Sequence, residues 1–170
     1  MCIIGSLSAL AERFALPLIS FIDRPAREAA AGPSSGREAA ALADALATLP
    51  TPTIGVLCGE LSGLESLALA ACRHLLAMEH AVLAPAAAEE VAARLFDAPA
   101  SLADAARVTQ LSAEEAKEAG IVEELIAEPV GGAHRDPARA FELVTAAAKR
   151  RLVAASREVR DDERREERPA

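Results

Sequence analysis

Aromatic side chains are almost missing from this chain of 170 residues: it has no tryptophan and no tyrosine, and aromatic residues make up 2% of the total. The core therefore has to be built from aliphatic side chains. Hydrophobic residues reach 52%, and many are alanine, which favours helices but adds little buried volume per residue. Such layers have to pack closely or gain contact area from a neighbouring subunit, so we expect an oligomer.

Clusters of basic residues and long apolar runs are also lacking. The formal net charge is −8, whereas nucleic-acid phosphates require a basic surface. A membrane helix needs about 18 consecutive apolar residues, and the most apolar region, residues 67–88, is interrupted by Arg73, His74 and Glu79. No basic stretch precedes an apolar run at the start, as in a secretory signal. We expect a cytoplasmic protein that binds neither nucleic acid nor membrane.

Patterns typical of disulfides and metal sites are missing too. The cysteines Cys2, Cys58 and Cys72 are odd in number and widely spaced, which suits neither a disulfide framework nor a zinc site and indicates a reducing compartment. We expect them to be small buried side chains. The histidines at positions 74, 80 and 134 do not group with acidic residues at ligand spacing, so we expect structural roles for them and no metal.

Helices and strands are predicted to alternate along the chain. Helical patterns cover residues 6–14, 37–49, 64–72 and 87–96, and buried strands are expected at 17–22, 53–57, 75–78, 81–84 and 121–126. Loops are expected at residues 24–36 and 59–63, which contain prolines or glycines. This order indicates an α/β protein with a mostly parallel sheet.

Several helix ends are marked by capping signals. Ser101 with Asp104 and Ser112 with Glu115 have the spacing of capping boxes, and Gly120 suits the end of the second of these helices. Residues 136–137, Asp-Pro, suit the start of a long final helix. We expect one domain over residues 1–156. The charged residues 157–170 are expected to be a frayed helix end or a disordered tail.

Three segments carry a family resemblance. Residues 11–23, AERFALPLISFID, are similar to the run AEKFGLPVITFID of the α subunit of acetyl-CoA carboxylase carboxyltransferase, residues 79–82 read EHAV as in that family, and residues 131–137 match its GGAHRDP. The order of segments resembles the family from residue 11 to about residue 148. The last match is the most specific.

This resemblance implies a crotonase-like (ClpP/crotonase) spiral of ββα units with a long C-terminal helix. The family's α subunit has further sheet and helix ahead of the point where this chain begins, so the resemblance implies an N-terminally truncated spiral. An exposed edge strand and apolar surface would then be covered by another chain or by self-association.

The resemblance also implies an activity: transfer of a carboxyl group from carboxybiotin to an acyl-CoA, as in malonyl-CoA formation for fatty acid biosynthesis. It implies a carboxyltransferase β-like partner and a biotin carrier protein. No covalently bound cofactor is expected, because acyl-CoA and carboxybiotin would be presented to the site, the latter by a partner.

The loop that corresponds to the family's glycine-rich oxyanion loop differs from it. The family reads Gly-Glu-Gly-Gly-Ser-Gly-Gly-Ala, and residues 59–66 read GELSGLES. Glycines let a backbone N–H approach a developing oxyanion. Four of them are replaced, and a carboxylate at position 65 about 4 Å from an oxyanion would cost about 4 kcal/mol, on the order of a thousandfold in rate. The candidate catalytic residues are Gly59, Glu60, Gly63 and Glu65.

A second family loop, Thr-Pro-Gly-Ala-Tyr-Pro-Gly, corresponds to residues 24–30, RPAREAA. Arg24 and Arg27 are candidates to bind a CoA phosphate or a carboxylate, and the backbone amides of Ala26 or Arg27 could still donate hydrogen bonds. The alternative is that both arginines are simply solvated.

Three functions are compatible with these patterns. The leading hypothesis is a subunit with a degenerate site and weak or no activity alone, which acts in a complex on acyl-CoA or malonyl thioesters by carboxyl transfer or decarboxylation, or serves there as a non-catalytic pseudoenzyme. The second is a crotonase-type enzyme with altered activity that uses Glu60 or Glu65 as acid or base. Against it, carboxylates in the first turn of a helix commonly just satisfy the helix dipole. The third is a decayed fragment with little function.

Overall fold

A computed structural model describes residues 3–24, 35–84, 92–93 and 102–166. Its helices are α1 (Ile3–Phe14), α2 (Ser35–Thr48), α3 (Gly63–Ala70), α5 (Leu102–Thr109), α6 (Ala113–Glu118) and α7 (Pro137–Glu166). Its strands are β1 (Leu18–Arg24), β2 (Thr53–Ser62), β3 (His74–Met78), β4 (Val82–Ala84), β5 (Leu111–Ser112) and β6 (Glu124–Ile126). The predicted alternation of helices and strands is confirmed.

The six strands form one mostly parallel sheet organised around β2. Strand β1 pairs with one side of β2, while β3 pairs with the first part of its other side and β4 with the last part. Strand β6 extends the sheet beyond β3, and β5 is antiparallel to β4. The long β2 is therefore the strand from which a site at the carboxyl end of the sheet is built.

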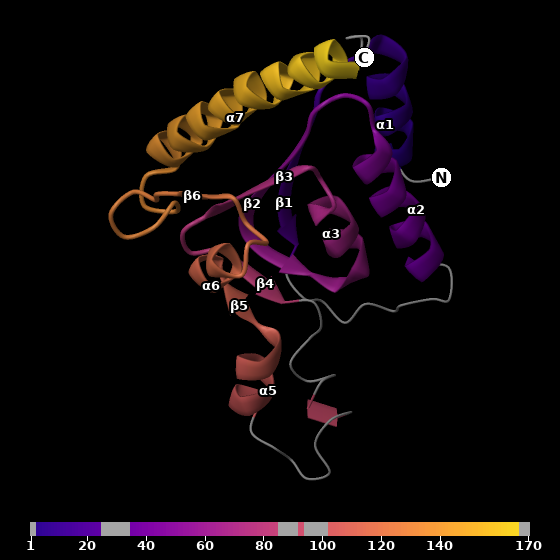
Figure 1. Ribbon diagram of the computed structural model, residues 1–170. Helices are drawn as coiled ribbons and strands as arrows, with labels where there is room; N and C mark the ends of the chain where they lie inside the picture. Colours follow the sequence, from indigo (N-terminus) through magenta and orange to yellow (C-terminus); the bar gives the residue numbers. More distant parts are fainter. Residues whose placement is uncertain (1–2, 25–34, 85–91, 94–101, 167–170) are drawn as a thin grey trace.

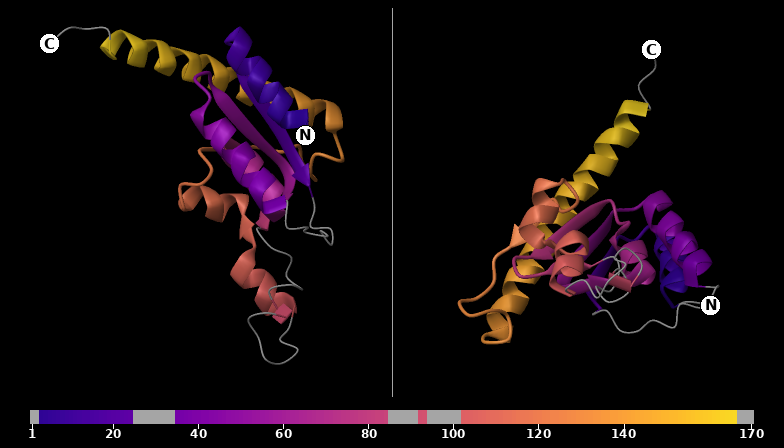
Figure 2. Two further views of the ribbon diagram at one scale, coloured as in Figure 1. Left: turned by 90° about the vertical axis from the view of Figure 1, so that its right-hand side faces the viewer. Right: turned by 90° about the horizontal axis from the view of Figure 1, so that it is seen from below.

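Helices cover both faces of this sheet (Figures 1 and 2). Helix α7 packs across β2, β3 and β6, while α3 contacts β1 and β2 and is itself covered by α2. Helix α1 packs on α2. None of the helices in the described part is both long enough and apolar enough to cross a membrane.

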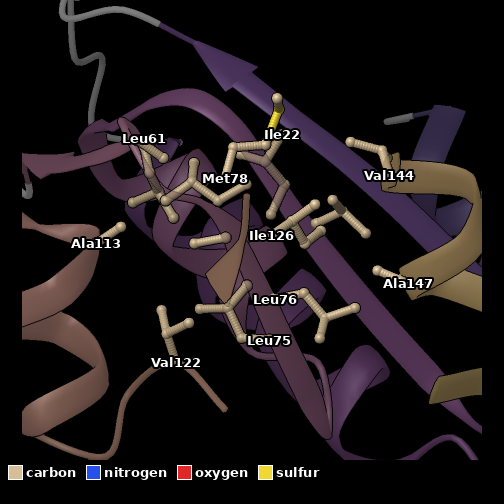
Figure 3. Close-up of a cluster of buried hydrophobic side chains, with 14 of the residues drawn as sticks. Ile22, Leu61, Leu75, Leu76, Met78, Ala113, Val122, Ile126, Val144 and Ala147 are labelled. Carbon is tan, nitrogen blue, oxygen red and sulfur yellow. The ribbon is translucent and has the colours of Figure 1, made fainter. Parts of the chain in front are cut away.

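The main core is aliphatic, as the composition predicts. It joins the sheet to α6 and α7, and Figure 3 shows Leu76, Ile126 and Val144 pointing toward one another from β3, β6 and α7. Alanines such as Ala113 and Ala147 bring these helices close to the strands. Closely packed alanine faces compensate for the small volume of each side chain.

The capping predictions hold where the structure describes them. The Ser112 side chain accepts a hydrogen bond from the Glu115 amide, and the Glu115 carboxylate accepts one from the Ser112 amide. Gly120 has a φ of 74°, as a glycine after a helix end requires. Asp136 accepts a hydrogen bond from the Arg139 amide at 3.0 Å at the start of α7. Ser101 lies outside the described residues.

Two predicted boundaries are wrong. Residues 59–62 were expected to form a turn, yet they continue β2, because residues 60–62 pair with β4. The last strand begins at Glu124 instead of residue 121, since the amides of Ile121 and Val122 both donate to the Ala116 carbonyl at the end of α6. Residues 157–166 continue α7 as a helix, which is the first of the two expectations for this segment, and Arg and Glu are favourable for extending an existing helix. The predicted helix at 87–96 and loop at 24–36 fall mainly on residues outside the described ones.

Candidate functional site

Strands β1 and β2 lose their regular pairing where both approach the carboxyl edge of the sheet. Ile22 pairs with Leu57, and the next pair is Arg24 with Leu61. One residue of β1, Asp23, therefore faces three residues of β2, namely Cys58, Gly59 and Glu60. An irregularity of this kind bends the strand and is frequent beside functional sites.

The Asp23 carboxylate fills the space that this bulge opens. Its Oδ1 atom accepts a hydrogen bond from the Glu60 backbone amide at 3.3 Å. A Cβ atom built on Gly59 would lie 2.3 Å from the same oxygen. Glycine is thus needed at position 59 because the Asp23 carboxylate lies so close to its backbone. A positive φ is not the reason, since Gly59 is not among the described residues with a positive φ. Because the amide of Glu60 donates to this carboxylate, it would have to leave Asp23 in order to serve a substrate oxyanion.

The change from strand to helix takes place at Gly63, which has a φ of 76°. This conformation is uncommon for residues with a Cβ, and a Cβ here would meet open space. The preceding residue, Ser62, is buried and its side chain makes no capping hydrogen bond to α3. The first amides of α3 therefore lie at a helix start that the Ser62 side chain does not cap, and a helix start is an arrangement that favours negative charge.

The residues that stand where the family loop has glycine are not all at the surface. Leu61 is completely buried and belongs to the main core, and it points into that core in Figure 3. Leu64 is exposed beside Gly63. Glu60 is half-buried in β2, and position 65 lies in the first turn of α3, with its side chain outside the described part. Catalytic roles for Gly59, Glu60, Gly63 and Glu65 stay predictions.

The second predicted loop begins next to the first. Arg24 is the last residue of β1, is exposed, and stands in register with Leu61. Parallel pairing therefore brings the start of the predicted arginine loop to the Gly59–Gly63 segment. Ala26 and Arg27 lie outside the described residues, so their predicted role in substrate binding stays a prediction.

Cys58 on β2 and Cys72 just ahead of β3 are free, half-buried thiols. Burial raises the pKa of the Cys58 thiol, and the nearby negative charge of Asp23 raises it further. Burial also raises the pKa of the Cys72 thiol to about 11, although a hydrogen bond with Ser20 opposes this shift. Both thiols therefore stay protonated at neutral pH and are poor nucleophiles. Cys2 lies outside the described residues.

The two most family-specific segments meet away from this bulge. The Glu128 carboxylate accepts hydrogen bonds from the amide of His80 at 3.2 Å and from the amide of Ala133 at 2.8 Å. One acidic side chain thereby ties the EHAV turn to the GGAHRDP loop. Gly131 and Gly132 have φ values of 86° and 96°, so this loop needs glycine for its backbone path. These segments therefore act as scaffold.

Sequence reasoning missed Asp23 and Glu128. Asp23 was counted as part of a matching scaffold segment, although its place directly after a buried strand could have marked it as a site residue. Glu128 gives no local signal, since its partners are 48 and 5 residues away in the chain.

His74 contacts the acidic side chains of Glu123 and Glu158 and the guanidinium of Arg151. Among the described residues, no three His, Cys, Asp or Glu lie close enough together to hold a metal ion.

Similar solved structures place this arrangement of sheet and helices in the crotonase-like class. Transcarboxylase 12S, described as a hexamer that binds substrate in a multienzyme core, has a TM-score of 0.59 at 20% identity over 73% of this chain and 27% of that chain. An enoyl-CoA hydratase from Thermoplasma volcanium GSS1 has a TM-score of 0.52 at 18% identity over 86% of this chain and 65% of that one. At these identities the likeness concerns the fold.

Within this class, the model of the acetyl co-enzyme A carboxylase carboxyltransferase-like family matches residues 5–170, and the chain belongs to that family. The acetyl-coenzyme A carboxylase carboxyl transferase subunit alpha of Rubrobacter xylanophilus is 35% identical over 153 residues, which are 88% of this chain and 48% of the relative. The family and fold predicted from the sequence are confirmed. The chain spans about half the length of that relative.

Proposed function

We propose that this chain is a subunit of an acyl-CoA carboxylase-type assembly. It acts beside a carboxyltransferase β-like partner on acyl-CoA or malonyl thioesters, by carboxyl transfer or decarboxylation, in the cytoplasm. The family match over residues 5–170 carries this proposal. A biotin carrier protein would present carboxybiotin, as the family resemblance implies.

The geometry at the carboxyl edge of the sheet supports a site to which this chain and a partner subunit each contribute residues. Enolate formation at a thioester needs N–H donors at the carbonyl oxygen. The Glu60 amide donates to Asp23, so within the described part of this edge the candidate donors are the amides at the start of α3, at Gly63 and Leu64, beside the predicted amides of Ala26 or Arg27. Asp23 and Glu60 add two carboxylates to this edge of the sheet, and negative charge near an oxyanion disfavours its formation. We therefore expect this chain to have little activity without a partner that supplies further N–H donors or positive charge.

Reconstitution with a β subunit from a family relative tests the proposal. We expect the two chains to copurify, and the mixture to form carboxybiotin from malonyl-CoA and free biotin at a rate at least tenfold above that of either chain alone. Acetyl-CoA release without biotin measures decarboxylation in the same samples. Loss of both activities and no complex between the two chains would contradict the proposal.

A substitution of Glu60 distinguishes two roles of this chain: supplying an acid or base, or supplying only backbone N–H donors. Glu60→Gln keeps the shape of the side chain but removes its charge, with Glu118→Gln on α6 as the exposed control. If this chain supplies donors and not an acid or base, Glu60→Gln should keep or raise the rate. A hundredfold loss of kcat with unchanged KM would instead assign Glu60 an acid/base role and favour the crotonase-type alternative.

A further inference from the structure

A cavity of about 310 Å³ lies at the amino ends of β1 and β2, where Pro17 and Pro52 directly precede the two strands. It is lined by residues from the end of α1, from the segment ahead of β2 and from the second half of α7, which Figure 1 shows reaching the end of α1. Strand β2 begins beside this cavity and runs for 10 residues, about 30 Å, to Ser62. The cavity is therefore separate from the Gly59–Gly63 segment.

Aliphatic residues form much of the wall of this cavity. Pro17, Pro50 and Pro52 share the wall with Ala15 and Val159, and proline offers no backbone N–H to a ligand. Small-molecule sites usually have volumes of about 300–1,000 Å³ and mostly apolar walls. This cavity lies at the lower end of that range and has room for about ten water molecules. It therefore suits a ligand of about the size of a dipeptide.

Thr51 also lines the cavity. The residue is 9% exposed, and its hydroxyl oxygen is buried without a hydrogen-bond partner among the described residues. A buried hydroxyl that stays unpaired costs folding free energy, and such groups in native proteins are usually satisfied by protein, water or a bound molecule. A polar group of a ligand in this cavity would supply the missing partner.

Two opposite charges complete the lining. Glu12 comes from α1 and Arg160 from α7, and both are exposed. The Arg160 Nε atom donates to the Ser156 carbonyl at 3.0 Å, while neither Glu12 nor Arg160 forms an ion pair with another described residue. A purely anionic ligand would meet the charge of Glu12, and a purely cationic one that of Arg160. A ligand that carries both charges can satisfy both side chains.

We propose that this cavity binds a small zwitterion with an aliphatic body, of the class of apolar dipeptides. The ammonium group of the ligand pairs with Glu12, and its carboxylate pairs with Arg160. The aliphatic body packs on the prolines and Val159, and a polar group of the ligand pairs with the Thr51 hydroxyl. This binding site is independent of the proposed carboxyl transfer, because it lies at the other end of β2.

The test titrates leucyl-alanine into the 170-residue chain and follows the amide signals by NMR. We expect shifts at Ala15, Thr51 and Val159, with a Kd of about 1 mM or tighter, as for a good ligand of this size. N-acetyl-leucyl-alanine lacks the ammonium group, and leucyl-alanine amide lacks the carboxylate. Each should bind at least tenfold more weakly, because one charge-assisted hydrogen bond is lost.

Matched variants assign each end of the ligand. Arg160→Gln should weaken leucyl-alanine at least tenfold but leave the affinity of its amide unchanged, and Glu12→Gln should do the same for the N-acetyl form. Thr51→Val removes the hydroxyl at nearly constant shape and should weaken binding at least threefold. Val159→Phe fills the cavity without a change of charge and should abolish binding. Arg157→Gln, on α7 but outside the lining, should leave the affinity unchanged.

Several results would overturn the inference. These are no shift at about 10 mM dipeptide, ten times the expected Kd, shifts that avoid the cavity, or equal affinities for the three ligands. Binding that Arg160→Gln, Glu12→Gln and Val159→Phe all leave intact would overturn it too. Circular dichroism confirms that each variant is folded, and the exposed Glu12 and Arg160 test the site without changing the core. No acyl-CoA or β subunit enters the experiment, so its outcome does not depend on the proposed activity.

Discussion

Ala15 occupies a backbone conformation that is unusual for a residue with a side chain. It follows α1 with a φ of 52° and is the only residue other than glycine with a positive φ among those described. The amide of Leu16 donates to the Ala11 carbonyl at 2.8 Å and that of Ala15 to the Glu12 carbonyl at 3.2 Å. This is the hydrogen-bond pattern of a helix end that favours glycine, and the similar family run has glycine here.

We predict that Ala15→Gly stabilises the protein. Removing the methyl group relieves a left-handed conformation that costs about 1–2 kcal/mol, and the extra freedom of glycine in the unfolded chain offsets part of this gain. The free energy of unfolding should rise by about 0.5–1 kcal/mol in urea titrations. Ala9→Gly, within α1, is the matched control and should lower it by about 1 kcal/mol. Equal effects of the two changes would refute the strain at Ala15.

Gly59 gives the second prediction at the scale of single residues. A Cβ there would displace the Asp23 carboxylate and break its hydrogen bond with the Glu60 amide. Gly59→Ala should therefore cost about 1–2 kcal/mol of folding free energy. In an Asp23→Ala background the same substitution should change stability by less than about 0.5 kcal/mol, because the obstacle is gone. Additive effects in this double-mutant cycle would show that Asp23 does not hold the bulge.

At the scale of elements, α7 is attached to the sheet through Arg151. Its Nη1 atom lies 3.0 Å from Glu158, and its Nε atom is buried 3.2 Å from Glu123 in an ionic contact that is not a hydrogen bond. His74, the first residue of β3, contacts Glu123 at 2.8 Å and the Arg151 guanidinium at 3.1 Å. This group joins three parts of the chain far apart in sequence.

Two neighbouring arginines of α7 allow a matched comparison. Arg151 is 19% exposed, whereas Arg150, which pairs with Glu124, is 62% exposed. We predict that Arg151→Ala lowers the free energy of unfolding by about 2 kcal/mol, since it removes a largely buried side chain and its packing together with its contacts to Glu123 and Glu158. Arg150→Ala should cost no more than about 0.5 kcal/mol, as for surface ion pairs. Denaturant melts measure both, and similar costs would contradict a special role of Arg151.

Local signals predicted the helix ends well. The Ser112 and Glu115 capping box and the Asp136 cap were found from residue type and spacing alone, because their partners lie three residues away. The extent of β2 could not be found in this way. Its last residues pair with Val82–Ala84, about 20 residues further along, and the sequence pattern of a glycine-containing turn gives no information on that partner.

For the molecule as a whole, alkaline pH should weaken folding through Cys72. Its pKa is about 11 in the folded protein, against 9.0 for an exposed thiol. A raised pKa means that the folded state holds its proton longer, so stability is constant below pH 9 and falls as the pH rises from 9 to 11. The loss approaches about 3 kcal/mol above pH 11, since each pKa unit corresponds to about 1.4 kcal/mol.

This prediction is checked by denaturant melts of the whole protein at pH values from 7 to 11. Cys72→Ala should flatten the decline, whatever its effect on stability at pH 7. Cys58→Ala keeps the Cys72 thiol and should retain that part of the decline. An unchanged alkaline slope in Cys72→Ala would assign the effect to other groups.

The sequence by itself determined the family, the α/β class, the aliphatic core and most element ends. These depend on composition, on short-range hydrogen bonds and on matching runs such as GGAHRDP, all of which are local in the chain. The sequence also indicated that Gly59 and Gly63 need to be glycine, although we expected both to serve the same purpose, the approach of a backbone N–H to an oxyanion.

Only the tertiary structure decided what those positions do. Gly59 makes room for Asp23, which is 36 residues away, while Gly63 alone supplies the positive φ at the start of α3. In the same way, Glu128 joins two scaffold segments, and the open side of β1 becomes visible once its single partner is known. Such contacts depend on which strands become neighbours, and that is fixed by packing across the whole sheet and not by any local run of residues.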